Sequence, residues 1–162
     1  MNIIVNDRAK LNLEKAKEMI DKWMRINYAC LFMEMEYRDI PHKIIAEEYL
    51  DCPEGVKDYR FFCFSGEPYQ VWVDLYSGTP NHIRSVYDMS WNKIEFRCTW
   101  PVGSELLSKK PANFQKMKEL ASILSKDFSF VRVDFYEING KIYMGEMTFT
   151  PMKGDGEFEP AM

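Results

Sequence analysis

The sequence predicts an α+β domain in which antiparallel sheets are flanked by two main helices. Three observations predict this class. Two segments carry apolar residues at helical spacing, several short segments are rich in strand-forming residues, and an Asn-Gly pair separates the last two of those segments. Along the chain the order is short strand, helix, several antiparallel strands, helix and hairpin, which is typical of the α+β class.

The first elements are a short strand in residues 2–5 and a helix in residues 13–28. Asn12 suits the N-cap position of this helix, and apolar residues at helical spacing follow it. They are Leu13, Ala16, Met19, Ile20, Trp23 and Met24. The helix can therefore bury one face.

The predicted strands that follow occupy residues 43–50, 59–64, 69–76 and 93–99. In residues 69–76, aliphatic residues alternate with Trp72 and Asp74, as expected of a strand with two different faces. A second helix is predicted in residues 112–126, with Pro111 near its start. Its apolar stripe consists of Phe114, Met117, Leu120, Ala121 and Leu124.

The last element is a hairpin in residues 130–150, around Asn139-Gly140. A two-residue turn would pair Ile138 with Lys141 and would place Glu146 among apolar residues. A three-residue loop would pair Glu137 with Lys141 instead. We predict the three-residue loop, because a one-residue slip moves every side chain to the other face and this register keeps the apolar residues together. A β-bulge is a second way to the same arrangement.

In the predicted register the two faces of the hairpin differ in character. The apolar face holds Val131, Val133, Phe135, Tyr143, Met147 and Phe149, with Gly145 among them; the other face holds Arg132, Asp134, Glu146 and Thr148. Two neighbouring carboxylates repel each other unless a cation lies between them. Mg²⁺ accepts one or two protein carboxylates and completes its shell with water and phosphate oxygens. The alternative is a solvated polar face whose Arg–Asp pair stabilises little.

Length and composition limit the kinds of molecule that this chain is expected to bind. A chain of 162 residues is long enough for one domain or two small lobes. Its formal net charge of −4 and the lack of a basic tract argue against nucleic acid, whereas a phosphorylated small molecule needs only local Arg and Lys. The four Cys residues show no C-x-x-C spacing, so free thiols in a cytoplasmic protein are expected. No signal peptide or apolar run of membrane-spanning length is found.

Three segments resemble the ATP-grasp superfamily, specifically its TupA-like (teichuronopeptide-biosynthesis) branch. The first is IIAEEYL in residues 44–50, followed by DYRFFCFSGEP in residues 58–68. It is similar to the hinge that holds adenine in ATP-grasp proteins. The resemblance implies an adenine slot lined by Glu47, Glu48, Tyr49 and Leu50, with Asp58 on the ribose and Lys43 near the nucleotide phosphates. The alternative is a strand end followed by a charged loop.

The second segment is TPNHIRSVYDMSWN in residues 79–92, where NHIR is similar to a pattern of this branch. The resemblance implies that Asn81, His82 and Arg84 contact the acceptor or the transferred phosphoryl group. The alternative for His82 is an exposed loop position without a chemical role.

The third segment is the hairpin, extended through TFTPMKGDGEFEP. It resembles the closing metal hairpin of the superfamily, with Arg132 holding a phosphate or acyl phosphate. Asp134 and Glu146 are implied to bind Mg²⁺ that bridges the ATP phosphates. Thr148 stands where many relatives carry Asn, as a third and weaker ligand.

The resemblance implies that residues 1–50 are the remnant of the small lobe, ending in the adenine hinge, and that residues 51–162 form the large lobe with the metal hairpin. It also implies a reaction in cell-surface polysaccharide or polymer biosynthesis. A carboxylate, from a sugar acid or an amino acid, attacks the γ-phosphate of ATP, and an amine or another nucleophile captures the acyl phosphate.

The phosphate-binding Lys strand and Gly-rich loop of the superfamily are not recognisable in this sequence. We therefore also expect three alternatives: a nucleotide-binding remnant without turnover, one subunit of a split enzyme, or a plain interaction domain. Self-association or a partner chain that supplies the missing part is expected in addition, because unpaired strand edges bind other strands.

Overall fold

The computed structural model describes residues 2–32, 34–50, 52, 55–103, 107, 109–154, 156 and 158–160. The chain divides into two compact units, residues 1–51 and 52–162. The predicted assignment of residues 1–50 to a small lobe and 51–162 to a large lobe stays a prediction.

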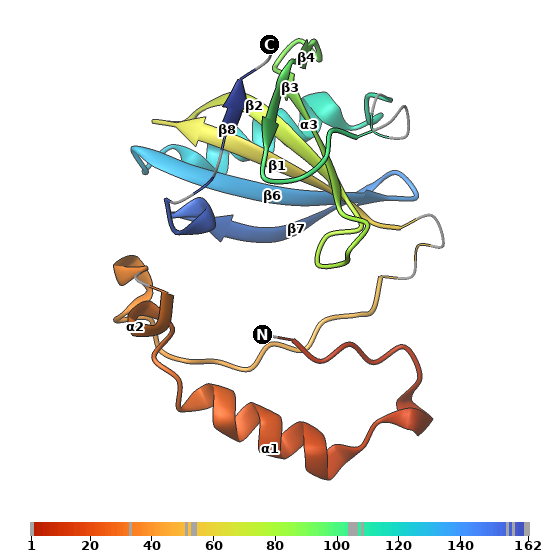
Figure 1. Cartoon of the computed structure of the whole chain (residues 1–162), viewed down its shortest axis with the longest axis vertical. Helices are drawn as coiled ribbons and strands as arrows, with labels where there is room; N and C mark the ends of the chain where they lie inside the picture. The colour runs from red at the N-terminus through yellow and green to blue at the C-terminus, as the bar shows by residue number, and fades with distance from the viewer. Residues whose placement is uncertain are drawn as a thin grey trace. The chain divides into compact units, whose positions relative to one another are not determined.

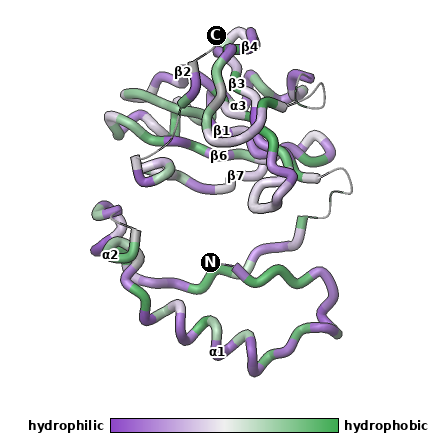
Figure 2. The backbone as a smooth tube through the Cα atoms, viewed as in Figure 1, coloured by the Kyte–Doolittle hydropathy of each residue, from purple (hydrophilic) through white to green (hydrophobic). Residues whose placement is uncertain are grey.

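The first unit contains short helices joined by extended chain (Figure 1). They are η1 (Arg8–Lys10), α1 (Leu13–Met24), α2 (Tyr28–Phe32) and η2 (Met35–Tyr37). The predicted N-cap of α1 is confirmed, because Asn12 Oδ1 accepts a hydrogen bond from the Lys15 N–H at 2.9 Å. The helix is shorter than residues 13–28, since the Arg25 N–H turns back to the Lys22 and Trp23 carbonyls. Figure 2 shows hydrophobic and hydrophilic residues mixed along α1, as an amphipathic helix requires.

Two strands predicted in this unit are wrong. Residues 2–5 and 43–50 are chain without regular secondary structure. A strand needs a hydrogen-bonded neighbour, and no described segment pairs with either of them. Their residue types favour an extended backbone, but no described strand forms hydrogen bonds with them.

The second unit is built on an antiparallel six-stranded sheet in the order β4-β3-β2-β1-β6-β7, which confirms the α+β class (Figure 1). The strands are β1 (Lys57–Phe64), β2 (Glu67–Leu75), β3 (Ile83–Asp88), β4 (Lys93–Ile94), β6 (Phe130–Ile138) and β7 (Lys141–Thr148). A second sheet pairs β5 (Phe96–Cys98) with β8 (Phe158–Pro160), which follows the short turn η4 (Pro151–Gly154). The single strand predicted in residues 93–99 is therefore two, because β4 pairs with β3 and β5 pairs with β8.

The helix α3 (Phe114–Ser125) packs against β1, β2 and β6 on one face of the six-stranded sheet. The predicted stripe faces this core: Phe114, Met117 and Ala121 are buried, and Leu120 and Leu124 pack against it. Every second residue of β1, β2 and β6 faces α3 and forms the sheet side of this core. These residues are Tyr59, Phe61, Cys63, Val71, Val73, Leu75, Val131, Val133 and Phe135. The remaining positions of the same strands point to the opposite face of the sheet.

The turn of the last hairpin differs from the prediction. Ile138 pairs with Lys141, so the loop is Asn139-Gly140 alone and the three-residue loop is wrong. Asn139 and Gly140 have φ of 51° and 74°. Positive φ at both positions defines the type I′ turn, which suits the right-handed twist of two paired strands.

The register changes between this turn and the charged residues. Phe135 pairs with Met144, but Val133 pairs with Met147, so β7 holds one residue more than β6 between these pairs. This bulge at Gly145 and Glu146 moves Glu146 to the face of Asp134. An unbroken ladder from a two-residue turn would place it opposite Val133. The predicted face of Arg132, Asp134, Glu146 and Thr148 is therefore present, and a bulge produces it.

One predicted member of the apolar face is wrong for the same reason. Tyr143 lies between the turn and the bulge and pairs with Tyr136, on the charged side. Ile142 packs against the core in its place, and Met147 and Phe149, beyond the bulge, pack there as predicted.

Candidate active-site face of the sheet

The face of the sheet opposite α3 carries charged and hydroxyl side chains from five neighbouring strands. They are Asp58 and Arg60 on β1, Asp74 on β2, Arg84 on β3, Arg132 and Asp134 on β6, and Glu146 and Thr148 on β7. Strand pairing explains why they meet: Asp74 lies opposite both Asp58 and Arg84, and Arg60 lies opposite Asp134. Directly paired residues point to the same face of a sheet.

On the hairpin, the three predicted metal ligands converge on one nitrogen atom. Arg132 Nη2 donates hydrogen bonds to Asp134 Oδ2 at 2.6 Å, Glu146 Oε1 at 2.8 Å and Thr148 Oγ1 at 2.9 Å. Arg132 Nε donates to the other oxygen of Asp134 at 2.7 Å. The predicted convergence of the two carboxylates is thus present, and the cation between them is a guanidinium.

The two carboxylates differ in environment. Asp134 is buried, and burial raises the pKa of its carboxyl group to about 6, although the Arg132 guanidinium acts in the opposite direction. The side chain of Glu146 is 63% exposed. The oxygen atoms that surround Arg132 are therefore buried in the sheet at Asp134 and open to solvent at Glu146.

A second ionic cluster surrounds Asp74, whose side chain is fully buried. Arg84 Nε and Nη2 donate to its two oxygens at 2.6 and 2.7 Å, and Arg60 Nε lies 3.0 Å from Oδ2. Burial alone would raise the pKa of Asp74, but the hydrogen bonds from Arg84 and the charges of Arg60 and Arg84 outweigh it, so the pKa lies below its usual value. Asp74 is therefore an anion that holds two guanidinium groups on this face.

Arg60 connects the two clusters. Its Nη2 donates to Asp58 at 2.9 Å, and its Nε lies 3.9 Å from Asp134. Ser77 also donates a hydrogen bond to Asp58. Neither Arg60 nor Asp74 was predicted as a site residue. Each stands between apolar residues in a strand, and this alternation is the signal that indicates a charged residue on the second face of the sheet.

The NHIR segment divides between this face and the surface. His82 is buried, with its Nε2 atom 3.3 Å from Asp74 Oδ2 and its ring stacked on Trp100 at 4.4 Å, so the exposed-loop alternative is wrong. Burial lowers the pKa of His82, which favours the neutral imidazole. Asn81 is exposed, and its backbone N–H bonds to Thr79 Oγ1 at 3.2 Å. The structure thus brings His82 and Arg84 to Asp74 and does not bring Asn81 there.

The predicted adenine residues belong to the first unit, apart from Asp58. Lys43, Glu47, Glu48 and Tyr49 are exposed and Leu50 is partly buried. Their contact with adenine stays a prediction.

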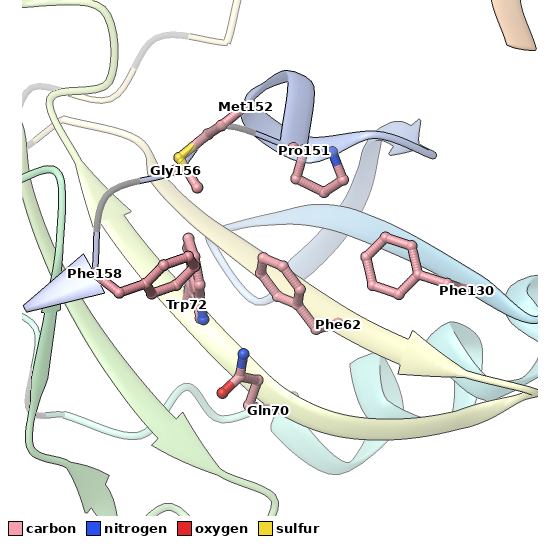
Figure 3. Close-up of a pocket in the computed structure, with 9 residues that line it drawn as sticks. Phe62, Gln70, Trp72, Phe130, Pro151, Met152, Gly156 and Phe158 are labelled. Atoms are coloured by element: carbon pink, nitrogen blue, oxygen red, sulfur yellow. The ribbon is translucent and has the colours of Figure 1, made fainter. Parts of the chain in front are cut away.

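An apolar cavity of about 270 Å³ lies on the same face (Figure 3). Its lining consists of Phe62, Gln70, Trp72, Phe130, Pro151, Met152, Gly154, Gly156 and Phe158. The cavity adjoins the hairpin cluster, because Phe62 is the strand partner of Arg132 and Phe130 precedes Arg132 by two residues on the same face. One half of this face is therefore aromatic and the other half ionic.

Among the described residues, no three His, Cys, Asp or Glu side chains are grouped so that they could hold a metal ion. Within the described part of this face, a metal site would therefore have two carboxylate ligands at most. None of the helices in the described part of the chain is long and apolar enough to cross a membrane.

A family model described as TupA-like ATPgrasp matches residues 1–162. The protein is therefore an ATP-grasp domain, a class of ATP-binding domain that generally uses ATP and Mg²⁺. Within that class, the chain belongs to the TupA-like ATP-grasp family, as the resemblance implied. No curated protein and no solved structure matches the chain.

Proposed function

We propose that this chain is the Mg-ATP-dependent part of a carboxylate–amine ligase, or of a related ligase, that acts in cell-surface polysaccharide or polymer biosynthesis. The observation that carries the proposal is the convergence of Asp134, Glu146 and Thr148 on one point of the sheet. Membership of the ATP-grasp class supports the use of ATP. The role in polymer biosynthesis is supported by the family resemblance alone.

The residues of the hairpin fit a magnesium ion. Carboxylate and hydroxyl oxygens are hard ligands of the kind that Mg²⁺ prefers, and the ion completes its shell with water and phosphate oxygens. When bound, Mg²⁺ supplies positive charge to the β- and γ-phosphate oxygens. Asp134 and Glu146 would hold it, and Thr148 would contribute a weaker contact, directly or through water.

The arginines on this face suit phosphoryl and acyl-phosphate oxygens. Arg132 offers paired donors beside the metal ligands. Arg84 uses two nitrogens on Asp74, while its Nη1 atom is buried and has no hydrogen-bond partner among the described residues. A phosphate oxygen would satisfy this donor. His82, neutral and beside Asp74, is suited to take a proton from the amine that captures the acyl phosphate.

The remaining predicted contacts complete the proposal. Glu47, Glu48, Tyr49 and Leu50 would surround adenine, Asp58 would bind the ribose, and Lys43 would approach the phosphates. Asn81, which is exposed, would contact the acceptor from the rim of the face. The acceptor is a carboxylate from a sugar acid or an amino acid.

The test combines binding with turnover. Mg-ATP affinity is measured by calorimetry for the wild type, for Asp134→Asn and for Glu146→Gln, with the exposed Glu119→Gln on α3 as a matched charge control. We expect each site variant to lose about tenfold or more in affinity and the control to keep it. Carboxylate-dependent release of ADP would support the ligase, whereas binding without stimulated release would support a nucleotide-binding domain without turnover. Equal Mg-ATP affinity in all four proteins would refute the site.

A further inference from the structure

Arg132 occupies the point at which the candidate metal ligands meet. Its Nη2 atom lies within 2.9 Å of all three oxygens, from Asp134, Glu146 and Thr148. Mg²⁺ binds oxygen at about 2.0–2.1 Å, so the ion would need the volume that this nitrogen fills. A guanidinium and a metal ion also repel each other at such separations. Arg132 and Mg²⁺ are therefore competitors for the same oxygens.

Arg132 cannot leave this position without a new partner. Its guanidinium is buried, and its Nε and Nη2 atoms are both bonded to Asp134. A buried charge that loses its partner is strongly destabilising. The other two arginines on this face are held by Asp58 and Asp74, so neither carboxylate is free to receive Arg132. Within the described part of this face, a bound ligand therefore has to supply the new anion.

The surroundings offer space for such a movement. The apolar cavity begins at Phe62 and Phe130, the neighbours of Arg132 across the sheet and along β6. The Arg side chain has four rotatable bonds, so its guanidinium can move towards a ligand. Its apolar methylene groups can pack against the aromatic wall of the cavity during this movement.

We infer that Arg132 is the resident cation of the carboxylate site and that metal and nucleotide load together. This inference rests on the proposed function. In the absence of ligand, Arg132 neutralises Asp134 and restrains Glu146. The phosphates of the incoming nucleotide draw Arg132 away from the carboxylates, and Asp134 and Glu146 then become available to the metal. The two ligands are thereby coupled: each raises the affinity of the protein for the other by the same factor.

The experiment measures the binding of Mn²⁺, an oxygen-seeking substitute for Mg²⁺, by electron paramagnetic resonance of the free ion. Binding is measured with and without a non-hydrolysable ATP analogue, for the wild type and for Arg132→Gln. For the wild type we expect weak metal binding alone and a gain of about tenfold or more with the nucleotide. For Arg132→Gln we expect metal alone to bind about tenfold or more tightly than to the wild type, and the gain from the nucleotide to shrink.

The matched control is Arg60→Gln. It removes the same charge from the same face, but among the described residues Arg60 forms no hydrogen bond or ion pair with Glu146 or Thr148, and its Nε atom only approaches Asp134 to 3.9 Å. An equal gain in metal affinity from Arg60→Gln would assign the effect to the overall charge of the face and overturn the inference. If Arg132→Gln does not fold, as judged by circular dichroism, Arg132→Lys replaces it. A single ammonium group holds two carboxylates and a hydroxyl less well than the guanidinium, so metal alone should still bind more tightly than to the wild type.

Two failures are distinguishable. Unchanged binding of metal alone in Arg132→Gln and Arg132→Lys, with nucleotide-dependent metal binding intact in the wild type, would overturn the inference and leave the proposed function standing. The double variant Asp134→Asn/Glu146→Gln tests the proposed function itself. If it binds metal in the presence of nucleotide as tightly as the wild type does, the proposed function is overturned.

Discussion

Neutralising Asp74 should destabilise the second unit strongly. Its side chain is fully buried and holds Arg84 through two hydrogen bonds of 2.6 and 2.7 Å, with Arg60 at 3.0 Å. The Asp74→Asn substitution keeps the shape and removes the charge, so both guanidinium groups lose their shared anion. Removing one partner of a buried ion pair lowers the free energy of unfolding by about 3–5 kcal/mol. Because Arg60 keeps Asp58 at 2.9 Å, we expect a value near the lower end, about 3 kcal/mol.

Urea denaturation followed by tryptophan fluorescence gives the free energy of unfolding. Asp127→Asn, at an exposed position after α3, serves as the control and should change it by less than about 0.5 kcal/mol. The double variant with Arg84→Met should lose less than the sum of the two single variants by about 2 kcal/mol, since it removes the uncompensated charge as well. A loss below about 1 kcal/mol for Asp74→Asn, or strict additivity with Arg84→Met, would contradict the view that Asp74 holds the arginines in place.

Three further substitutions test the fold and its response to pH. Gly140→Ala should destabilise the hairpin by about 1 kcal/mol, because φ is 74° at this turn position, and an unchanged melting temperature would argue against the type I′ turn. Phe61→Ala should lower the free energy of unfolding by about 3–5 kcal/mol, since Phe61 is fully buried against Phe114 and Phe135, and a loss below about 1 kcal/mol would mean that the core refills the cavity. The pKa of His82 is lowered in the folded protein, so the unfolded chain binds more protons just below the usual value of about 6.5, and stability should fall as the pH falls through that value. His82→Gln should flatten this pH dependence in urea titrations, and an unchanged slope would show that His82 is not its source.

The hairpin shows what a residue pattern can predict and what it cannot. The pattern correctly predicted that Arg132, Asp134, Glu146 and Thr148 share a face, because burying the apolar residues leaves no other arrangement. It did not show how the backbone achieves this. A three-residue loop and a two-residue turn followed by a bulge give the same faces at the site. They differ between the turn and the bulge, where Ile142, Tyr143 and Met144 lie on the opposite face from the one predicted.

The link between the two ionic clusters could not be predicted, for a different reason. Asp58, Arg60 and Asp74 are each visible as polar residues within consecutive strands, but the approach of Arg60 to Asp134 depends on the pairing of β1 with β6. The contact between β1 and β6 joins distant parts of the chain, and local patterns carry no information about it. The strand predicted at residues 43–50 failed on the same point, because a strand depends on its neighbour.

The pairing of β1 with β6 also bears on how the molecule reaches its native state. Phe61 and Val133 face each other although about 70 residues separate them, and closing so long a loop is slow in comparison with forming a helix or a hairpin. Until that closure, Arg60 has no Asp134 beside it and the hairpin cluster lacks its neighbouring strand. We therefore expect the β6–β7 hairpin contacts to form before the complete ionic face, which requires β1 to pair with β6.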